Sequence, residues 1–272
     1  MIDTLIVAVD GSEESWRAID VAARLAQRAA CSVRVVEVVA FDAIVDGIGE
    51  RLARQCDSHQ SVQDARAAGV EIDTTVVQHH DPVAGLLRQI DRSNAMVVMS
   101  SRGLGRTAAV IGSVTSTVVA EARVPVICVG PEVDVSITEW NGPVIATVDG
   151  SDLAERALPI ATRLADTVEA TAWIVNVSEP DHTPTDVVES AHIAHLARAL
   201  GPDTQFEVLH GDDVPTAVAA FATNQGAAAI VASTQGRTGL DRLVLGSTAA
   251  GFVRRAPCPV VLVNRTAPSL DP

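Results

Sequence analysis

The chain has 272 residues, of which 47% are hydrophobic and only 3% aromatic, and its formal net charge at pH 7 is −14. That length fits two domains of ordinary size, and the acidity disfavours partners with an anionic surface, such as nucleic acids and membranes. The sequence contains no lysine. This excludes ATPases with a Walker A motif, protein kinases and pyridoxal enzymes, because each of them needs a lysine side chain.

The cysteines are isolated and form no C-x-x-C pair, so we expect buried, reduced thiols and a cytoplasmic location. They are Cys31, Cys56, Cys128 and Cys258. The first strand pattern begins within a few residues of Met1. No apolar run approaches the roughly eighteen residues of a membrane span, so we predict neither a signal peptide nor a transmembrane helix.

Predicted strands and helices alternate along the first half. An apolar run at residues 4–9 is typical of a strand buried on both faces, and it ends in Asp10-Gly11-Ser12. Ser12 and the two glutamates after it indicate a helix that runs to about residue 29. Further strands are predicted at 32–39, 70–77, 95–99 and 124–129, and helices at 41–67 (interrupted near Gly47 and Gly49), at 82–90 and before the last strand.

The same order restarts after a linker at 130–143, which contains glycine and proline at both ends. A strand at 144–148 ends in Asp149-Gly150-Ser151, a repeat of the earlier turn. Strands at 171–177, 205–209, 227–232 and 259–263 follow, with helices from 151 to about 166 and at 186–200, 214–222 and 249–255. We therefore predict two tandem domains, 1–136 and 137–272.

Strands that alternate with helices predict right-handed crossovers and parallel sheets. The expected fold class is α/β, with two tandem open five-stranded parallel sheets flanked by helices in a Rossmann-like arrangement. Each half ends in an apolar strand, at 125–129 and 259–263, and an unpaired edge of this kind needs a cover. These two strands can pair inside one chain to form an internal pseudo-dimer, and a homodimer of two chains is a further alternative.

A loop of small residues follows the fourth strand of each half. In the second half it reads Ser233-Thr234-Gln235-Gly236, then nine residues, then Gly246-Ser247-Thr248. In the first half it reads Ser100-Ser101-Arg102-Gly103, then eight residues, then Gly112-Ser113. Glycines let an anion approach the backbone, and a helix N-terminus supplies positive potential, so such loops can hold phosphates without lysine.

Taken together, the two Asp-Gly-Ser turns, the two glycine loops and the segment Arg254 to Val260 before the last strand make the chain resemble a tandem universal stress protein of the adenine nucleotide alpha-hydrolase-like superfamily. ATP-binding members carry G-x-x-G, nine residues, then G-S/T. The second repeat keeps this spacing with Ser233 in place of the first glycine, whereas the first repeat has Ser100 there and is one residue shorter. The resemblance therefore implies a better-preserved nucleotide motif in the second domain.

The resemblance also assigns roles to individual residues. An aspartate after the first strand would hold the ribose side, and backbone on the second strand would meet the adenine edge. The glycine loop and the next helix would surround the phosphates. In the second domain these residues are Asp149, Val177, Ser233, Gly236, Arg237, Gly246, Ser247 and Thr248; in the first they are Asp10, Val38, Gly103, Gly112, Ser113 and Val114.

The expected function is that of a stress-response protein that binds ATP, with or without Mg²⁺, or another adenine nucleotide. We expect regulation rather than catalysis, because no general base or nucleophile is visible, and an adenylating or flavin-carrying relative would need an additional motif. His192 and His195 share one helical face, but two ligands do not make a metal site. The alternative is a ligand-free scaffold of the same fold that acts through protein–protein contacts.

Overall fold

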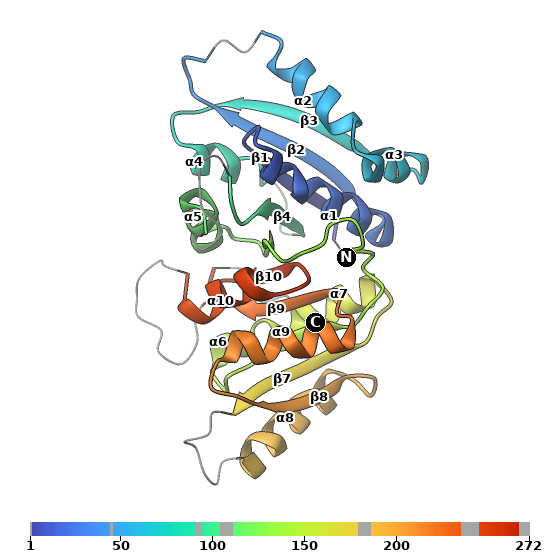
Figure 1. The fold of residues 1–272 in the computed structure, drawn as a ribbon, viewed down its shortest axis with the longest axis vertical. Helices are drawn as coiled ribbons and strands as arrows, with labels where there is room; N and C mark the ends of the chain where they lie inside the picture. The colour runs from blue at the N-terminus through green and yellow to red at the C-terminus, as the bar shows by residue number, and fades with distance from the viewer. Residues whose placement is uncertain are drawn as a thin grey trace.

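The structure is a computed structural model that describes residues 2–43, 46–90, 94–103, 111–178, 186–234 and 245–266, without the side chains of 186–189. Within these residues, ten strands form one sheet in the order β3-β2-β1-β4-β5-β10-β9-β6-β7-β8 (Figure 1). The strands are β1 (Thr4–Val9), β2 (Ser32–Val39), β3 (Ile72–Gln78), β4 (Ala95–Ser100), β5 (Val126–Val129), β6 (Val144–Thr147), β7 (Ala172–Ser178), β8 (Gln205–His210), β9 (Ala229–Ser233) and β10 (Val260–Val263).

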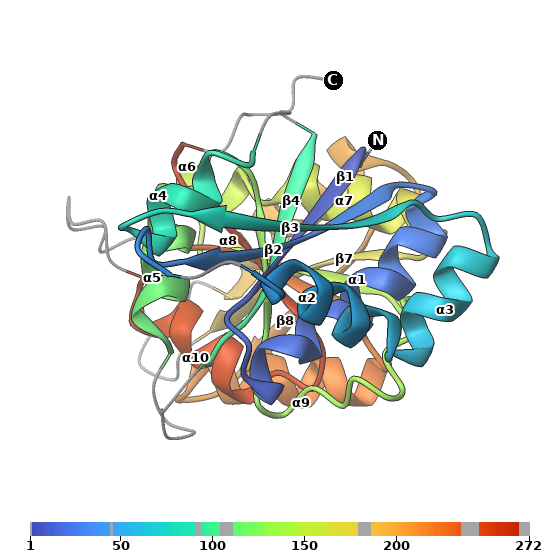
Figure 2. The same cartoon turned by 90° about the horizontal axis from the view of Figure 1, so that it is seen from above.

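Helices cover both faces of this sheet, and each face has its own continuous apolar core that extends through both halves. One core receives side chains from α1 (Glu13–Ala29), α2 (Ile48–Asp57), α3 (Gln60–Ala67), α6 (Asp152–Glu155), α7 (Leu158–Thr167) and α8 (Asp186–Leu200). The other receives them from α4 (Pro82–Leu87), α5 (Ser113–Glu121), α9 (Val214–Gln225) and α10 (Ser247–Arg255). Figure 2 shows the twist of the sheet, with β1 and β4 steeply inclined to β2 and β3.

The two halves meet at their last strands. β5 and β10 pair antiparallel, with Ile127 opposite Val261, whereas the pairs within each half are parallel. The predicted fold class and the predicted pairing of the two last strands inside one chain are therefore confirmed. Two five-stranded parallel sheets join into one because each covers the apolar edge of the other. The boundary at 136/137 stays a prediction, as does a homodimer.

Two predicted helices differ from the structure. The helix expected from 151 to 166 is divided into α6 and α7, because Pro159 lies in the first turn of α7 and cannot donate an amide hydrogen bond. In the first half, Gly47 does not interrupt a helix but precedes α2 as its N-cap, with a φ of 81°. The interruption lies at Ser58 and His59, where α2 ends and α3 begins.

The linker packs tightly on the first half. Trp140 is fully buried and its indole Nε1 donates to the Val21 carbonyl of α1 at 3.1 Å. Two arginines of α1 hold linker carbonyls: Arg17 donates to Val133 at 2.5 Å, and Arg24 donates to Val135. The linker is thus part of the core on the α1 side of the sheet. Among the described residues, no helix has the length and apolar character required to cross a membrane.

Candidate functional site

The candidate site lies where the order of parallel strands reverses. β1 has β2 on one side and β4 on the other, so the chain leaves β1 and β4 at adjacent carboxyl ends. Ligands of open α/β sheets bind in the crevice at such a point. Asp10 follows β1 directly, and the loop with Gly103 follows β4, as the sequence predicted.

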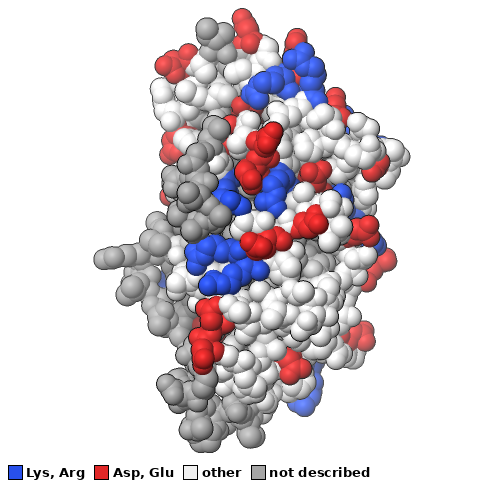
Figure 3. Space-filling view, viewed as in Figure 1, with Lys and Arg blue, Asp and Glu red and all other residues white. Residues whose placement is uncertain are grey.

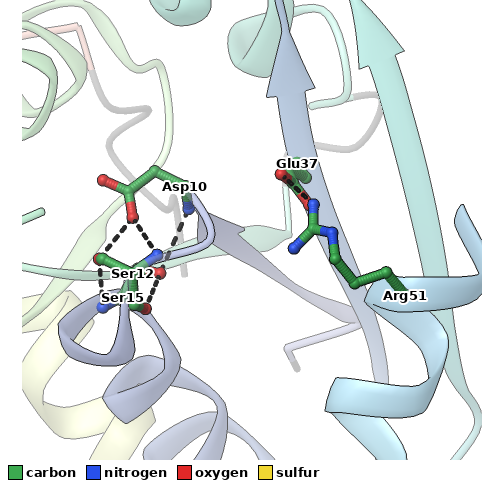
Figure 4. A network of polar contacts seen from close by, with 5 residues as sticks. All are labelled: Asp10, Ser12, Ser15, Glu37 and Arg51. Carbon is green, nitrogen blue, oxygen red and sulfur yellow. Dashed lines mark hydrogen bonds and ion pairs between the residues drawn. The ribbon is translucent and has the colours of Figure 1, made fainter. Parts of the chain in front are cut away.

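The Asp10-Gly11-Ser12 turn is held by its own side chains (Figure 4). Oδ1 of Asp10 accepts from the Ser12 amide at 3.0 Å and from the Ser12 hydroxyl at 2.6 Å. Gly11 has a φ of 82°, the left-handed region that favours glycine. The other carboxylate oxygen of Asp10 faces Gly103, and a Cβ on that glycine would overlap it. Gly103 is therefore needed because the Asp10 carboxylate packs on its backbone.

Gly112 closes the glycine loop of the first half and begins α5. Its amide donates to the Ser101 carbonyl at 2.8 Å, and the Thr115 hydroxyl donates to the Ser100 carbonyl at 3.1 Å. These contacts tie the start of α5 to the end of β4. Since Gly112 has no side chain to cap the helix, amides of the first turn need an acceptor from elsewhere.

These segments enclose a cavity of about 240 Å³. Its wall contains all the residues predicted for the first domain: Asp10, Val38, Gly103, Gly112, Ser113 and Val114. Sequence reasoning missed the apolar part of the wall, formed by Val36 and Met99 from the sheet and Leu86 from α4. The signal was present, because Val36 and Val38 are two residues apart on one strand and so face the same side. The cavity thus has a polar end at the loops and an apolar floor.

Arg102 also lines this cavity. Its side-chain Nε is buried and has no hydrogen-bond partner among the described residues. The sequence placed Arg102 near the loop, but only the structure shows its unpaired nitrogen.

The serines in place of the first motif glycine cause no backbone strain. Ser100 and Ser233 are the last residues of β4 and β9. Among the described residues, the non-glycine positions with positive φ are Ala30, Trp140 and Glu169. The serines have ordinary strand geometry, and their cost is confined to local bulk.

The second domain repeats the frame of the site. Oδ1 of Asp149 accepts from the Ser151 amide at 3.0 Å and from its hydroxyl at 2.6 Å, as in the first domain. The Gly246 amide donates to the Thr234 carbonyl at 3.0 Å, and exposed Ser247 and Thr248 begin α10. Val177 lies on β7 and Ser233 ends β9. The predicted residues Gly236 and Arg237 lie outside the described residues, so the comparison of the two motifs stays a prediction.

An ion pair that the sequence did not predict lies on the opposite face of β2. Glu37 is buried beside Val38, and Arg51 of α2 donates to its two oxygens at 2.6 and 2.7 Å (Figure 4). A Cβ on Gly11 would lie 3.6 Å from the Arg51 guanidinium. A glutamate between valines in a predicted strand was the available signal. The pair packs against the turn that presents Asp10.

Titratable groups elsewhere form no second candidate site, neither for a metal ion nor for a reactive thiol, within the described residues. No cluster of three or more histidine, cysteine or acidic side chains there could hold a metal ion. All four cysteines are free and buried, as predicted. Burial raises the pKa of Cys31 and Cys56 to about 11, and that of Cys128 and Cys258 to about 12. These thiols are therefore poor nucleophiles at neutral pH.

Comparisons of the sequence with family models and with known proteins point to the same family. The model of the universal stress protein family matches residues 1–130 and 141–264. Universal stress protein Rv1996 of Mycobacterium tuberculosis is 29% identical, over 96% of this chain and 94% of its own length. A universal stress protein of Thermus aquaticus is 32% identical over 47% of this chain and 99% of its own length.

Among solved structures, a universal stress protein from Archaeoglobus fulgidus superposes with a TM-score of 0.73 at 20% identity. The match covers 97% of this chain and 99% of that one, and it supports the fold. Both halves match the family model, and the same Asp-Gly-Ser turn geometry is present in both. The chain therefore belongs to the universal stress protein family.

Proposed function

We propose that this protein binds an adenine nucleotide, ATP or a shorter relative, in the cavity of the first domain. The observation that carries the proposal is the convergence of Asp10, Gly103 and Gly112 on one cavity at the switch point of the sheet. These residues come from two loops and a helix start that are far apart in the sequence. Their meeting matches what the family resemblance implies for the ribose and phosphates.

The two ends of the cavity suit the two ends of a nucleotide. Val36, Leu86 and Met99 offer an apolar surface of the kind that a purine ring can cover. At the polar end, glycine backbone and the first turn of α5 offer amides to phosphate oxygens. Asp10 stands between these ends and can accept hydrogen bonds from ribose hydroxyls.

The acidity of the chain does not oppose this proposal. Charges more than about 8–10 Å away are screened at physiological salt, so groups near the cavity dominate. On the face shown in Figure 3, arginine side chains gather around the middle of the molecule, with acidic side chains interspersed. The potential at the cavity is therefore not set by the net charge.

We propose regulation by occupancy rather than catalysis. The described wall of the cavity contains no histidine or cysteine, and the chain contains no lysine. Serine and threonine hydroxyls are present, but a hydroxyl nucleophile needs an adjacent base, and Oδ1 of Asp10 is already held by the amide and the hydroxyl of Ser12 in the turn. A bound nucleotide would then act by stabilising α5 and the glycine loop. A role in survival under stress follows from the family resemblance.

Isothermal titration calorimetry with ATP, ADP, AMP and cyclic AMP tests binding. The decisive variant is Gly103→Ala, whose Cβ would displace the Asp10 carboxylate. We expect it to lose one binding site or to weaken that site at least tenfold. The matched control is Gly49→Ala, because no atom lies within 4 Å of a Cβ there. Absence of heat at millimolar nucleotide, or unchanged binding in Gly103→Ala, would contradict the proposal.

A further inference from the structure

The guanidinium of Arg102 has a nitrogen without a hydrogen-bond acceptor in the part of the chain that the structure describes. Its Nε is buried and unpaired within the described residues, although the side chain lines the cavity. Other arginines have carboxylate partners, such as Arg51 with Glu37 at 2.6 Å and Arg66 with Asp57 at 2.5 Å. No ion pair among the described residues involves Arg102. The side chain thus lines the cavity with a buried Nε that has no acceptor within the described residues.

A buried N–H group of a charged side chain is costly without an acceptor. An acceptor from outside the chain would remove that cost. Guanidinium presents planar, parallel donors, which match the oxygens of a phosphate or carboxylate better than a neutral carbonyl. An anion is therefore the acceptor that this guanidinium suits best.

The surroundings of Arg102 favour phosphate. Gly103 follows it directly, and Gly112 and Ser113 at the start of α5 line the same cavity. The positive end of a helix and a guanidinium thus border one space, and both favour negative charge. Asp10 lies beside Gly103, so a ligand there must offer hydroxyl groups to the carboxylate as well as an anion to the arginine.

We infer that Arg102 binds the phosphate of the nucleotide and makes the first domain prefer phosphorylated nucleosides to free nucleosides. This inference rests on the proposed function, because it names the part of the ligand that Arg102 contacts. The corresponding residue in the second motif is the neutral Gln235. The preference contributed by this side chain therefore belongs to the first domain alone.

The test compares AMP with adenosine by calorimetry on the full chain, at the site that Gly103→Ala removes. The wild-type protein is expected to bind AMP at least tenfold more tightly than adenosine. Arg102→Gln should weaken AMP binding roughly tenfold to a hundredfold, the range for a charge-assisted hydrogen bond, and change adenosine binding less than about twofold. Arg102→Lys should lie between, since it keeps the charge without the planar donors.

The control is Arg28→Gln, which removes the same charge from an exposed position on α1. Thermal unfolding followed by circular dichroism checks that each variant is folded. Equal AMP affinity in the wild type and Arg102→Gln would overturn the role of Arg102 and leave nucleotide binding intact. A wild-type protein that binds neither AMP nor adenosine would overturn the proposed function itself.

Discussion

The two halves of the chain share the frame of the site but differ in what supports it. Both have the same aspartate turn, with identical distances of 3.0 and 2.6 Å from the carboxylate to the serine. Both close the glycine loop with an amide-to-carbonyl bond at the start of the next helix. Sheet topology and these local bonds are sufficient to keep the frame, because each is satisfied within a few residues or between adjacent strands.

The support on the opposite face has diverged. In the first half, buried Glu37 on β2 pairs with Arg51 of α2. The corresponding residue on β7 is Asn176, which donates to the Val148 carbonyl at 3.0 Å, while its Oδ1 has no partner among the described residues. A helix therefore anchors the second strand in the first half, whereas in the second half the anchor is backbone. The difference teaches that the frame does not depend on one particular anchor.

The halves also differ where each touches the other. Asn264 follows β10, and its Nδ2 donates at 2.8 Å to the carbonyl of Val119 in α5 and to that of Ala122, the C-cap of this helix. Gly130 follows β5 at the matching position, and a Cβ there would overlap the Val253 carbonyl of α10. One helix end is thus capped by a side chain of the other half, and the other helix end is covered by bare backbone.

The largest expected effect is a loss of folding stability at alkaline pH. It affects the two halves unequally, because they contain different numbers of buried cysteines. Cys31, Cys56 and Cys128 belong to the first half and Cys258 to the second. Burial raises the pKa of these thiols from 9.0 to about 11 or 12. Below about pH 9 the thiols are neutral in both states, and their contribution to stability is complete. Above it the unfolded chain releases protons first, so this contribution falls and is lost as pH passes the folded pKa.

The expected loss is about 1 kcal/mol per thiol for each pH unit above 9, or about 4 kcal/mol in total between pH 9 and 10. Urea unfolding at pH 8, 9 and 10 measures it. The signal is clean because the chain has no lysine or tyrosine, whose titration normally obscures this range. Replacement of Cys258 by alanine should remove about a quarter of the slope. A stability that does not change from pH 8 to 10 would show that the thiols are not buried.

The second largest effect is expected for the linker, which packs on the first half just before the second half begins. Trp140→Ala should lower the free energy of unfolding by about 3–5 kcal/mol, because a fully buried indole leaves a large cavity. Trp140→Phe keeps most of the packing but loses the bond to Val21, and should cost less. Equal losses in the two variants would mean that packing of the ring is not what holds the linker. Urea unfolding at neutral pH gives both values.

Much of this comparison could be predicted from the sequence. Apolar runs such as residues 95–99 identify buried strands, and the repeated Asp-Gly-Ser turn places Asp10 and Asp149 at the same edge. These predictions succeed because they depend on local pattern and on the rules of parallel crossovers. The division between α6 and α7 could also have been predicted, since Pro159 is a residue that favours the first turn of a helix.

The remaining features depend on contacts between distant segments. Arg51 reaches Glu37 only because α2 packs against the sheet at β3, the neighbour of β2. Nothing near Trp140 in the sequence indicates that it enters the core of the first half. The unpaired Nε of Arg102 is a property of the folded cavity. That Ser100 has ordinary strand geometry could likewise be seen only from the backbone dihedral angles, because a motif alone does not say which glycine needs a positive φ.

Gly130→Ala tests the bare side of the junction. Its Cβ would overlap a helix carbonyl, which cannot rotate away as a side chain can, so β5 or α10 must shift. We expect a loss of about 1–3 kcal/mol, the usual cost of overpacking. Gly49→Ala is again the control, because a Cβ there meets no atom within 4 Å. If both variants were equally stable, the close approach of the two halves would not constrain the fold.

Asn264→Ala tests the capped side and should have the smallest effect, about 1–2 kcal/mol, because carbonyls at the end of α5 lose their donor. The control is Asn141→Ala, an exposed linker residue whose side-chain amide donates to Glu139 at 3.3 Å. Hydrogen exchange sharpens the test. Amides in the last turn of α5 should exchange faster in Asn264→Ala, whereas those of α10, whose end lies against Gly130, should not change. Since α5 begins at the candidate cavity, equal loosening of both helices would mean that the amide stabilises the junction as a whole and not this helix.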